Sequence, residues 1–134
     1  MRRLRILFFL ILGFISPDVF SQTQADLNQT ADEAYVKADK DLNNVYQLIL
    51  KNYSSDTVFI KNLKSSQRIW IAFRDAELKM KYPEREAGYY GSIQPMCVSN
   101  FLEQLTRQRI STLQVWLDGT EEGDPCSGSV KVKD

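Results

Sequence analysis

The sequence predicts an all-α protein, a small antiparallel bundle of three main helices with a structured loop and a C-terminal tail tied back by a disulfide. Three observations support this prediction. Three long segments carry apolar residues at helical spacing, short connections separate them, and strand-like alternation is limited to a weak pattern at 129–132. With 134 residues, the chain has the length of one domain.

The N-terminal segment has the features of a secretory signal peptide. Three arginines stand within the first five residues, and residues 6–15 are apolar apart from Gly13. Val19 and Ser21 are small enough for the positions that a signal peptidase reads, so we expect cleavage after Ser21. The apolar run is shorter than the about 20 residues that cross a bilayer, so we expect a periplasmic or secreted protein without a stable membrane anchor.

The exported part, 22–134, should form one helical domain with a core at about 24–117 and a tail at 118–134. Removal of residues 1–21 takes three arginines and Asp18 from 17 charges of each sign, which leaves 14 basic and 16 acidic residues. This slightly acidic balance is not typical of nucleic-acid binding, although it is compatible with a basic partner.

The chain contains no histidine. This absence excludes serine–histidine and cysteine–histidine nucleophile pairs, as well as zinc sites with histidine ligands. We therefore expect a protein that is not an enzyme and that has no catalytic residues, no cofactor and no metal site.

The first predicted helix covers residues 24–53. Thr30, with Glu33 three residues later, would form a capping box if the helix started late, and Thr23 with Asp26 offers an earlier start. Apolar and small residues at spacings of three and four form one stripe along this helix. The stripe consists of Leu27, Ala31, Ala34, Ala38, Leu42, Val45 and Ile49.

The second predicted helix covers about 57–82. Ser55 or Asp56 can cap its start, and Pro83 ends it because the residue before a proline disfavours the α conformation. The side chains expected on its inner face are Phe59, Leu63, Trp70 and Phe73.

Residues 83–95 form the longest irregular connection. A loop of this length in a small domain is often functional. Tyr89, Tyr90 and Ser92 are therefore candidate partner-binding residues, although rings in such a loop also often only cover a core.

The third predicted helix begins at Pro95 or Ser99 and ends at Asp118, where Gly119 is a typical helix stop. Its expected inner side consists of Phe101, Leu102, Leu105, Arg109, Leu113 and Trp116. An even number of cysteines in an exported protein indicates a disulfide, so we expect Cys97 and Cys126 to be bonded and to tie the tail to this helix, with two free thiols as the alternative.

The tail is acidic. Asp118, Glu121, Glu122 and Asp124 fall within seven residues with no base among them. The spacing resembles the start of a calcium loop, but Ser129 stands where that motif needs a glutamate, so we expect no calcium site. The remaining alternatives are a solvated tail and a patch for a basic protein, with Glu121, Glu122 and Asp124 as candidate partner-binding residues.

The densest stretch of the chain is 67–77, which reads QRIWIAFRDAE. On a helix, Gln67, Trp70, Arg74 and Glu77 share one face. They either hold helices together or form an aromatic and arginine recognition face. Asp75 and Glu77 are two residues apart and point in different directions, so they are no carboxylate pair for glycoside hydrolysis.

Three pieces of this sequence, taken in order, resemble the family of the LprI lysozyme inhibitor. They are the Leu-Asn pair at 42–43, the Trp-x-x-Phe-Arg-Asp-Ala-Glu segment at 70–77 and Leu-Thr-x-x-Arg at 105–109, and the likeness extends over about 24–117. The resemblance implies a helical periplasmic or surface domain that binds a lysozyme and blocks it. Lysozymes are commonly basic, so the acidic exported chain suits such a partner.

The resemblance transfers no catalytic residue. It implies that Arg74 or Arg109 pairs across helices with Asp39, Asp75 or Glu77. Many relatives carry cysteines near the positions of Leu78 and Phe101, so an apolar contact between these two residues is expected to replace a bridge. The alternative function is that of an envelope structural or interaction domain that does not inhibit a lysozyme.

Overall fold

The computed structural model describes the backbone of residues 18–133 and the side chains from Thr23 to Lys133. The protein is all-helical, as predicted, with α1 (Asp18–Asn52), α2 (Thr57–Lys81) and α3 (Gln94–Asp118). Over the described residues there is no strand, and the weak strand pattern contributes one parallel bridge between Thr120 and Val132. No described helix is both long and apolar enough to span a membrane.

The predicted signal peptide lies almost entirely in residues 1–17, outside the described residues, so it stays a prediction. α1 starts at Asp18, six residues before the predicted start, and runs through the expected cleavage site after Ser21.

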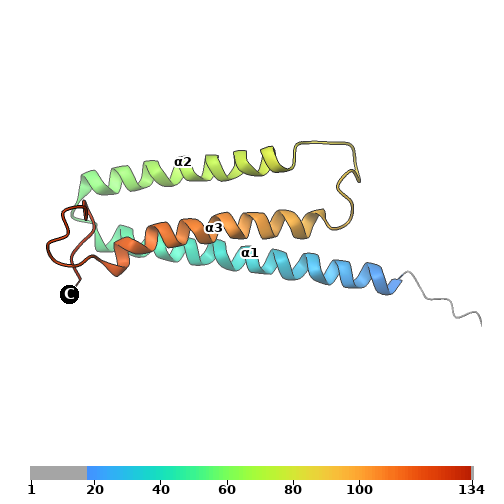
Figure 1. Ribbon diagram of the computed structural model, residues 1–134, viewed down its shortest axis with the longest axis horizontal. Helices are drawn as coiled ribbons and strands as arrows, with labels where there is room; N and C mark the ends of the chain where they lie inside the picture. The colour runs from blue at the N-terminus through green and yellow to red at the C-terminus, as the bar shows by residue number, and fades with distance from the viewer. Residues whose placement is uncertain (1–17, 134) are drawn as a thin grey trace, which may run out of the picture.

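Successive helices run in opposite directions along a long, narrow molecule (Figure 1). The packing between them is unequal. Most contacts between helices join α1 and α3, and far fewer join α2 and α3. The well-packed pair, α1 and α3, runs side by side in the same direction (Figure 1).

Two contacts show that α1 and α3 keep one register over their whole length. At one end Asn28 Nδ2 donates to the Ser92 carbonyl, 64 residues later in the chain. At the other end the Tyr53 hydroxyl donates to the Trp116 carbonyl, 63 residues later. Because the two offsets differ by only one residue, each turn of α1 meets a fixed turn of α3.

The seam between α1 and α3 follows a spacing of seven residues. Ser99, Thr106 and Leu113 are the buried residues of α3. In α1 the buried residues lie seven and four apart, a spacing that keeps one stripe facing a neighbouring helix. They are Ala31, Ala38, Leu42 and Ile49, and the buried Tyr53, directly after α1, continues the same spacing.

The seam changes character along its length. Toward the N-terminus of both helices its buried residues are the small Ala31, Ala38 and Ser99, and small residues allow helices to approach closely. Toward the C-terminus Ile49 and Leu113 form the large apolar core together with Leu63 of α2. The core of the protein therefore lies at the tail end of the bundle.

α2 has only one buried residue, Leu63. Phe73, which we expected on the inner face, is 50% exposed, and Ile69 and Met80 are more exposed still. Leu27 of the predicted α1 stripe is also exposed, since it lies before the point where the close α1/α3 packing begins.

The helix ends follow the sequence signals with one exception. The Asp56 side chain accepts a hydrogen bond from the Phe59 backbone N–H and caps α2, and Pro83 follows the last turn of α2. The exception is the start of α1, which lies at Asp18, before both of the starts considered at Thr23 and Thr30. Thr30 therefore forms no capping box, and its Oγ1 donates to the Asp26 carbonyl instead.

The tail closes the core end of the bundle. The Tyr53 hydroxyl accepts the Lys131 backbone N–H, and the Trp116 ring nitrogen donates to the Ser129 hydroxyl. Gly119 starts the tail with φ +74°, and its Cα faces the Lys131 carbonyl so closely that a Cβ would lie 3.0 Å from that oxygen.

The expected disulfide is absent, and both cysteines are free thiols. Cys97 lies in the first turn of α3, whereas Cys126 lies in the tail that packs near Trp116 at the other end of α3. Nineteen helical residues from Cys97 to Trp116 span roughly 28 Å. A disulfide needs Cα atoms about 4.4–6.8 Å apart, so these two residues of one chain cannot bond in this fold.

Thr106 is fully buried in the seam, and its hydroxyl has no hydrogen-bond partner among the described residues. We predict that Thr106→Val raises the free energy of unfolding by about 1 kcal/mol, because valine keeps the shape and removes an unsatisfied polar group. Urea unfolding followed by circular dichroism measures this difference.

The matched control is Thr112→Val in the same helix, where the hydroxyl is exposed and donates to the Gln108 carbonyl. This substitution should change stability by less than about 0.5 kcal/mol. A loss of stability in Thr106→Val larger than in the control would contradict the described seam.

Candidate functional site

Trp70 of α2 lies between two arginines from different helices. The Cζ atom of Arg74 is 5.5 Å from the centroid of the Trp70 ring, and that of Arg109 from α3 is 5.9 Å from it. Both distances fall within the range of cation–π contacts. We call this group, together with Gln67, the arginine belt; it occupies the middle of the bundle.

Arg74 joins α2 to α1. Its Nε and Nη2 atoms donate to Oδ1 of the neighbouring Asp75 at 2.9 and 2.8 Å, and Nη1 lies 4.0 Å from Oδ1 of Asp39. The side chain is only 16% exposed. The ion pair between helices that the family resemblance implied is therefore present, with Asp39 as the partner on α1.

Arg109 joins α3 to α2 without the help of an acid. Its Nε donates to Gln67 Oε1 and its Nη2 to Ser66 Oγ, both at 3.0 Å. Burial lowers the pKa of Arg109 below its ordinary value, since the charged form loses water contacts.

Tyr35 of α1 belongs to the same region. Burial raises the pKa of its hydroxyl, and the positive charge of Arg74 opposes that rise. Asp39 and Asp75 add to it as nearby negative charges. The surroundings of Arg74 thus mix a phenol, two carboxylates and an indole, all supplied by α1 and α2.

The geometry of the arginine belt favours the first of the two interpretations of 67–77, in which these side chains hold helices together. The belt side chains are partly buried. Arg109 donates its hydrogen bonds to Gln67 and Ser66 of α2, and Arg74 forms an ion pair with Asp39 of α1. Glu77 lies on the same face and is partly buried, but it makes no ion pair among the described residues.

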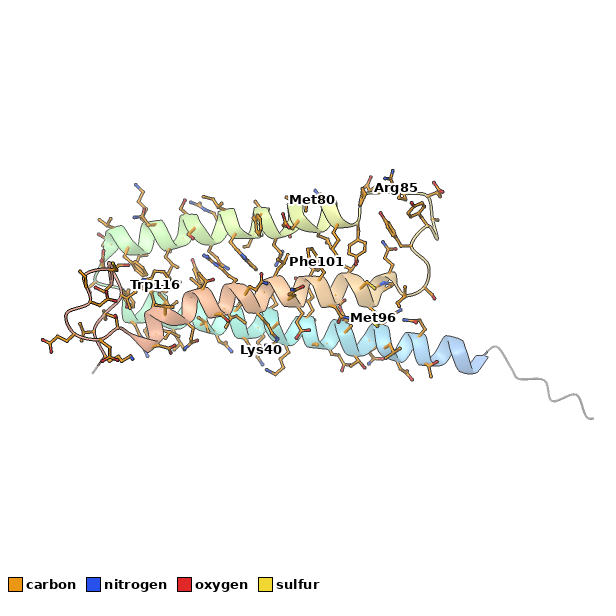
Figure 2. The ribbon with its side chains drawn as sticks, viewed as in Figure 1. Lys40, Met80, Arg85, Met96, Phe101 and Trp116 are labelled. Atoms are coloured by element: carbon orange, nitrogen blue, oxygen red, sulfur yellow. The ribbon has the colours of Figure 1, made fainter. Side chains whose placement is uncertain are left out.

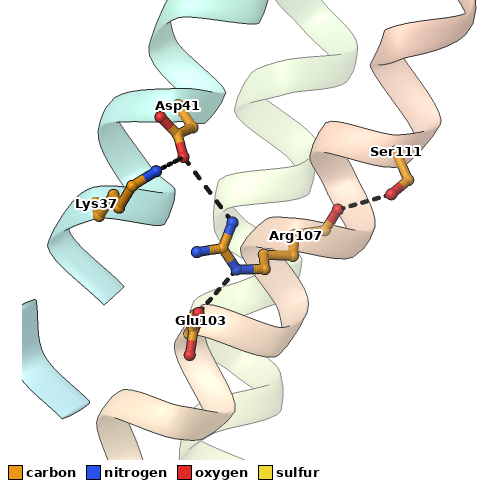
Figure 3. Close-up of polar contacts among 5 residues, drawn as sticks. All are labelled: Lys37, Asp41, Glu103, Arg107 and Ser111. Atoms are coloured by element: carbon orange, nitrogen blue, oxygen red, sulfur yellow. Dashed lines mark hydrogen bonds and ion pairs between the residues drawn. The ribbon is translucent and has the colours of Figure 1, made fainter. Parts of the chain in front are cut away.

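A second ionic cluster joins α1 to α3 and was not predicted. Arg107 Nε donates to Glu103 Oε1 at 2.8 Å, and its Nη1 is 3.9 Å from Oδ2 of Asp41, which also accepts from Lys37 (Figure 3). Arg107 is 47% exposed. The register between the two helices creates this cluster, and a single sequence does not reveal that register.

Residues 82–93 form a loop that we call the tyrosine loop. The Tyr90 ring meets the rings of Tyr82 and Tyr89 edge-on, with centroids 5.6 and 4.9 Å away. The Tyr90 hydroxyl donates to the Pro83 carbonyl, and Arg85 lies 5.8 Å from the Tyr89 ring centroid. Arg85 stands at the end of the molecule opposite Trp116 (Figure 2).

The three candidate residues of this loop have different surroundings. Tyr89 is 60% exposed, whereas Tyr90 is half-buried and contacts other groups of the loop. Ser92 contributes its carbonyl to the Asn28 hydrogen bond, which fixes the loop to α1. Tyr89 is therefore the ring that is open to a partner.

Cys97, in the first turn of α3 after the tyrosine loop, lies beside the Tyr82 hydroxyl. Burial raises the pKa of that hydroxyl, and the neighbouring thiol adds to the effect. Phe101 meets the Lys81 ammonium, 3.9 Å from its ring centroid, so a cation–π contact connects α2 and α3 here. The expected contact between Leu78 and Phe101 stays a prediction.

The acidic tail is less open than its sequence indicated. Glu121 forms an ion pair with Lys133 at 2.8 Å, and this contact lowers the pKa of Glu121. Asp124 accepts hydrogen bonds from Thr120 Oγ1 and from the Cys126 backbone N–H. Lys133 thus neutralises Glu121, and Asp124 is held by neighbouring polar groups of the tail. Glu122 is the exposed candidate acid without such a bond among the described residues.

Among the side chains from Thr23 to Lys133, no group of three or more histidine, cysteine, aspartate or glutamate residues is placed to hold a metal ion.

Comparison with known proteins finds a family match over most of the chain. Residues 19–113 match the family model described as lysozyme inhibitor LprI. An uncharacterized protein of Rhizobium meliloti (strain 1021) is 33% identical over 110 residues, an alignment that covers 74% of this chain and 77% of that protein. No solved structure matches the chain significantly. The tyrosine loop and the arginine belt lie inside the matched range, whereas the tail lies outside it.

Arg74 and Arg107 provide a matched test of the arginine belt. Each has one acid at 2.8 Å and a second near 4 Å on α1, but Arg74 is 16% and Arg107 is 47% exposed. We predict that Arg74→Met lowers the free energy of unfolding by about 2 kcal/mol, because the mostly buried guanidinium loses its charged hydrogen bonds and its cation–π contact with Trp70.

Arg107→Met should lower it by less than about 1 kcal/mol, because exposed ion pairs contribute little. Urea unfolding of the two variants and the unaltered protein measures both values. Equal losses in the two variants would mean that the arginine belt is no more important than a surface ion pair.

Proposed function

Since the chain belongs to the family of the lysozyme inhibitor LprI, we propose that it is an exported binding protein that blocks a lysozyme by direct contact. The family match over residues 19–113 is the observation that carries this proposal. An inhibitor that acts by contact needs no reactive group, which agrees with a sequence without histidine.

We further propose that the tyrosine loop makes the contact. Tyrosine and arginine are the residue types that most often contribute strongly to binding at protein interfaces. Tyr89 is exposed and Arg85 lies over its ring, so both groups are presented together at one end of a narrow molecule. A narrow end can enter a cleft that a flat helical face cannot.

The tyrosine loop is held in place before any partner arrives. Edge contacts among its rings, the bond from Tyr90 to Pro83 and the bond from Asn28 to Ser92 fix its shape. A loop ordered in advance loses less conformational entropy on binding, so more of the contact energy remains for affinity.

The chemistry of the target suits this loop. Lysozymes cleave their substrate with two carboxyl groups in a cleft that holds a sugar chain. A guanidinium group lying against an aromatic ring can offer the cleft a cation for the carboxylates and a flat surface for the sugar subsites. Arg85 and Tyr89 supply these two groups.

The tail is a weaker candidate for the contact. It lies beyond the range that the family model matches, and two of its three candidate acids already bond within the tail. Its charge can still speed the approach of a basic lysozyme, an effect that added salt would weaken.

We predict that Tyr89→Ala weakens inhibition at least about tenfold, as expected when a central interface ring is removed. The protein, purified after export from a bacterial host, is titrated against a panel of lysozymes in a cell-wall lysis assay at low salt. The concentration that halves lysis is compared between the variant and the unaltered protein.

Phe73→Ala is the matched control, because Phe73 is also an exposed ring but lies on α2 away from the loop. It should change inhibition by less than about twofold. Equal losses in both variants would remove the loop from the proposal. Undiminished lysis across the whole panel would instead favour the alternative, an envelope domain that does not inhibit a lysozyme.

A further inference from the structure

A groove of about 430 Å³ lies between α2 and α3 near the tail. This volume falls in the range of about 300–1,000 Å³ that is usual for small-molecule sites. The buried Leu63 and Leu113 form its floor, and the half-buried Phe59 and Trp116 form its walls. The groove exists because α2 packs less closely against α3 than α1 does. It is therefore an apolar cleft that is already open in the folded protein.

Arg109 stands at one end of this groove without an acid partner. Among the residues whose side chains are described, no carboxylate lies within ion-pair distance of its guanidinium group. The group bonds the neutral Gln67 and Ser66, and these two bonds leave donors of its five N–H groups unused. Burial lowers its pKa, because the charged form loses contact with water.

The opposite end of the groove carries a negative charge. Asp56 lines this end, and its carboxylate is held there because it caps α2. The ten residues from Asp56 to Ser66, next to Arg109, span roughly 15 Å of helix. A negatively charged ligand group is therefore attracted to the Arg109 end and repelled from the Asp56 end.

We propose that this groove binds an amphipathic organic anion, a carboxylate with an unbranched apolar chain. The carboxylate pairs with Arg109, where a planar guanidinium matches its two oxygens. The chain lies on Leu63 and Leu113 between the rings of Phe59 and Trp116. The site is distinct from the tyrosine loop, so it is independent of lysozyme binding.

Trp116 lets the binding be observed directly. Its ring lines the groove while its nitrogen is fixed by the hydrogen bond to Ser129, so a ligand changes its environment without moving it. The experiment titrates the exported, purified protein with decanoate and follows tryptophan fluorescence. Decanol, which has the same chain length without the charge, is titrated in parallel at concentrations below those at which either compound aggregates.

The expected result is a saturable signal with decanoate and an affinity for decanol at least about tenfold weaker, because a charged hydrogen bond is lost. Arg109→Gln should weaken decanoate binding by about the same factor, and Arg109→Lys should restore part of it. Arg107→Gln, two residues earlier on the exposed side of α3, should leave the affinity within about twofold. Circular dichroism confirms that each variant is folded.

Three results would overturn the proposal. They are the absence of a saturable signal with decanoate, an equal affinity for decanol, and a full decanoate affinity in folded Arg109→Gln. The comparison of the two ligands uses only the unaltered protein, so it decides the matter even if the Arg109 variants do not fold. None of these results depends on a lysozyme, so the inhibitor proposal and this proposal can fail separately.

Discussion

The close, parallel packing of α1 against α3 is the constraint from which the other features of this protein follow. Small residues at a spacing of seven, such as Ala31, Ala38 and Ser99, let the two helices lie near each other at the loop end. Larger residues at the same spacing, Ile49 and Leu113, build the core at the tail end. The register is fixed at both ends by hydrogen bonds of Asn28 and Tyr53. Two helices that run the same way need a long return segment between them, and α2 is that segment.

α2 consequently has a different kind of attachment. Its only fully buried residue is Leu63, with Phe59, Ile60 and Trp70 partly buried against the core. Polar and cation–π contacts of Arg74 and Arg109 add to this attachment. Arginine suits this role because one guanidinium group can stack on an aromatic ring and donate several hydrogen bonds at once. Because α2 is loosely attached, the groove near Trp116 stays open. The tyrosine loop follows the other end of α2. The two proposed binding sites therefore lie at the two ends of the least buried helix.

Much of the fold was predictable from the sequence because its signals are local. The Asp56 cap, Pro83 and Gly119 each act on the adjacent backbone, and each ends or starts a helix where expected. The absence of the expected disulfide was not predictable, because the presence of two cysteines in an exported chain does not indicate which end of a helix each one occupies. The arginines of 67–77 could be assigned to one face, but the choice of Asp39 as a partner depends on the register of α1 against α2. The uneven packing of α2 could not be predicted for the same reason. Phe73 and Met80 fit an apolar helix face in the sequence, and only the fold shows that both side chains are exposed.

Amide hydrogen exchange, resolved by residue, tests most directly whether the α1/α3 pair carries the stability of the fold. Amides that open only by global unfolding exchange slowest, and those in loosely packed elements exchange through local opening. The account predicts the slowest exchange in α1 from Ala31 to Tyr53 and in α3 from Ser99 to Leu117, with α2 after Leu63 exchanging clearly faster. Equal protection across all three helices would contradict it, since α2 would then be as firmly held as the pair on which it rests.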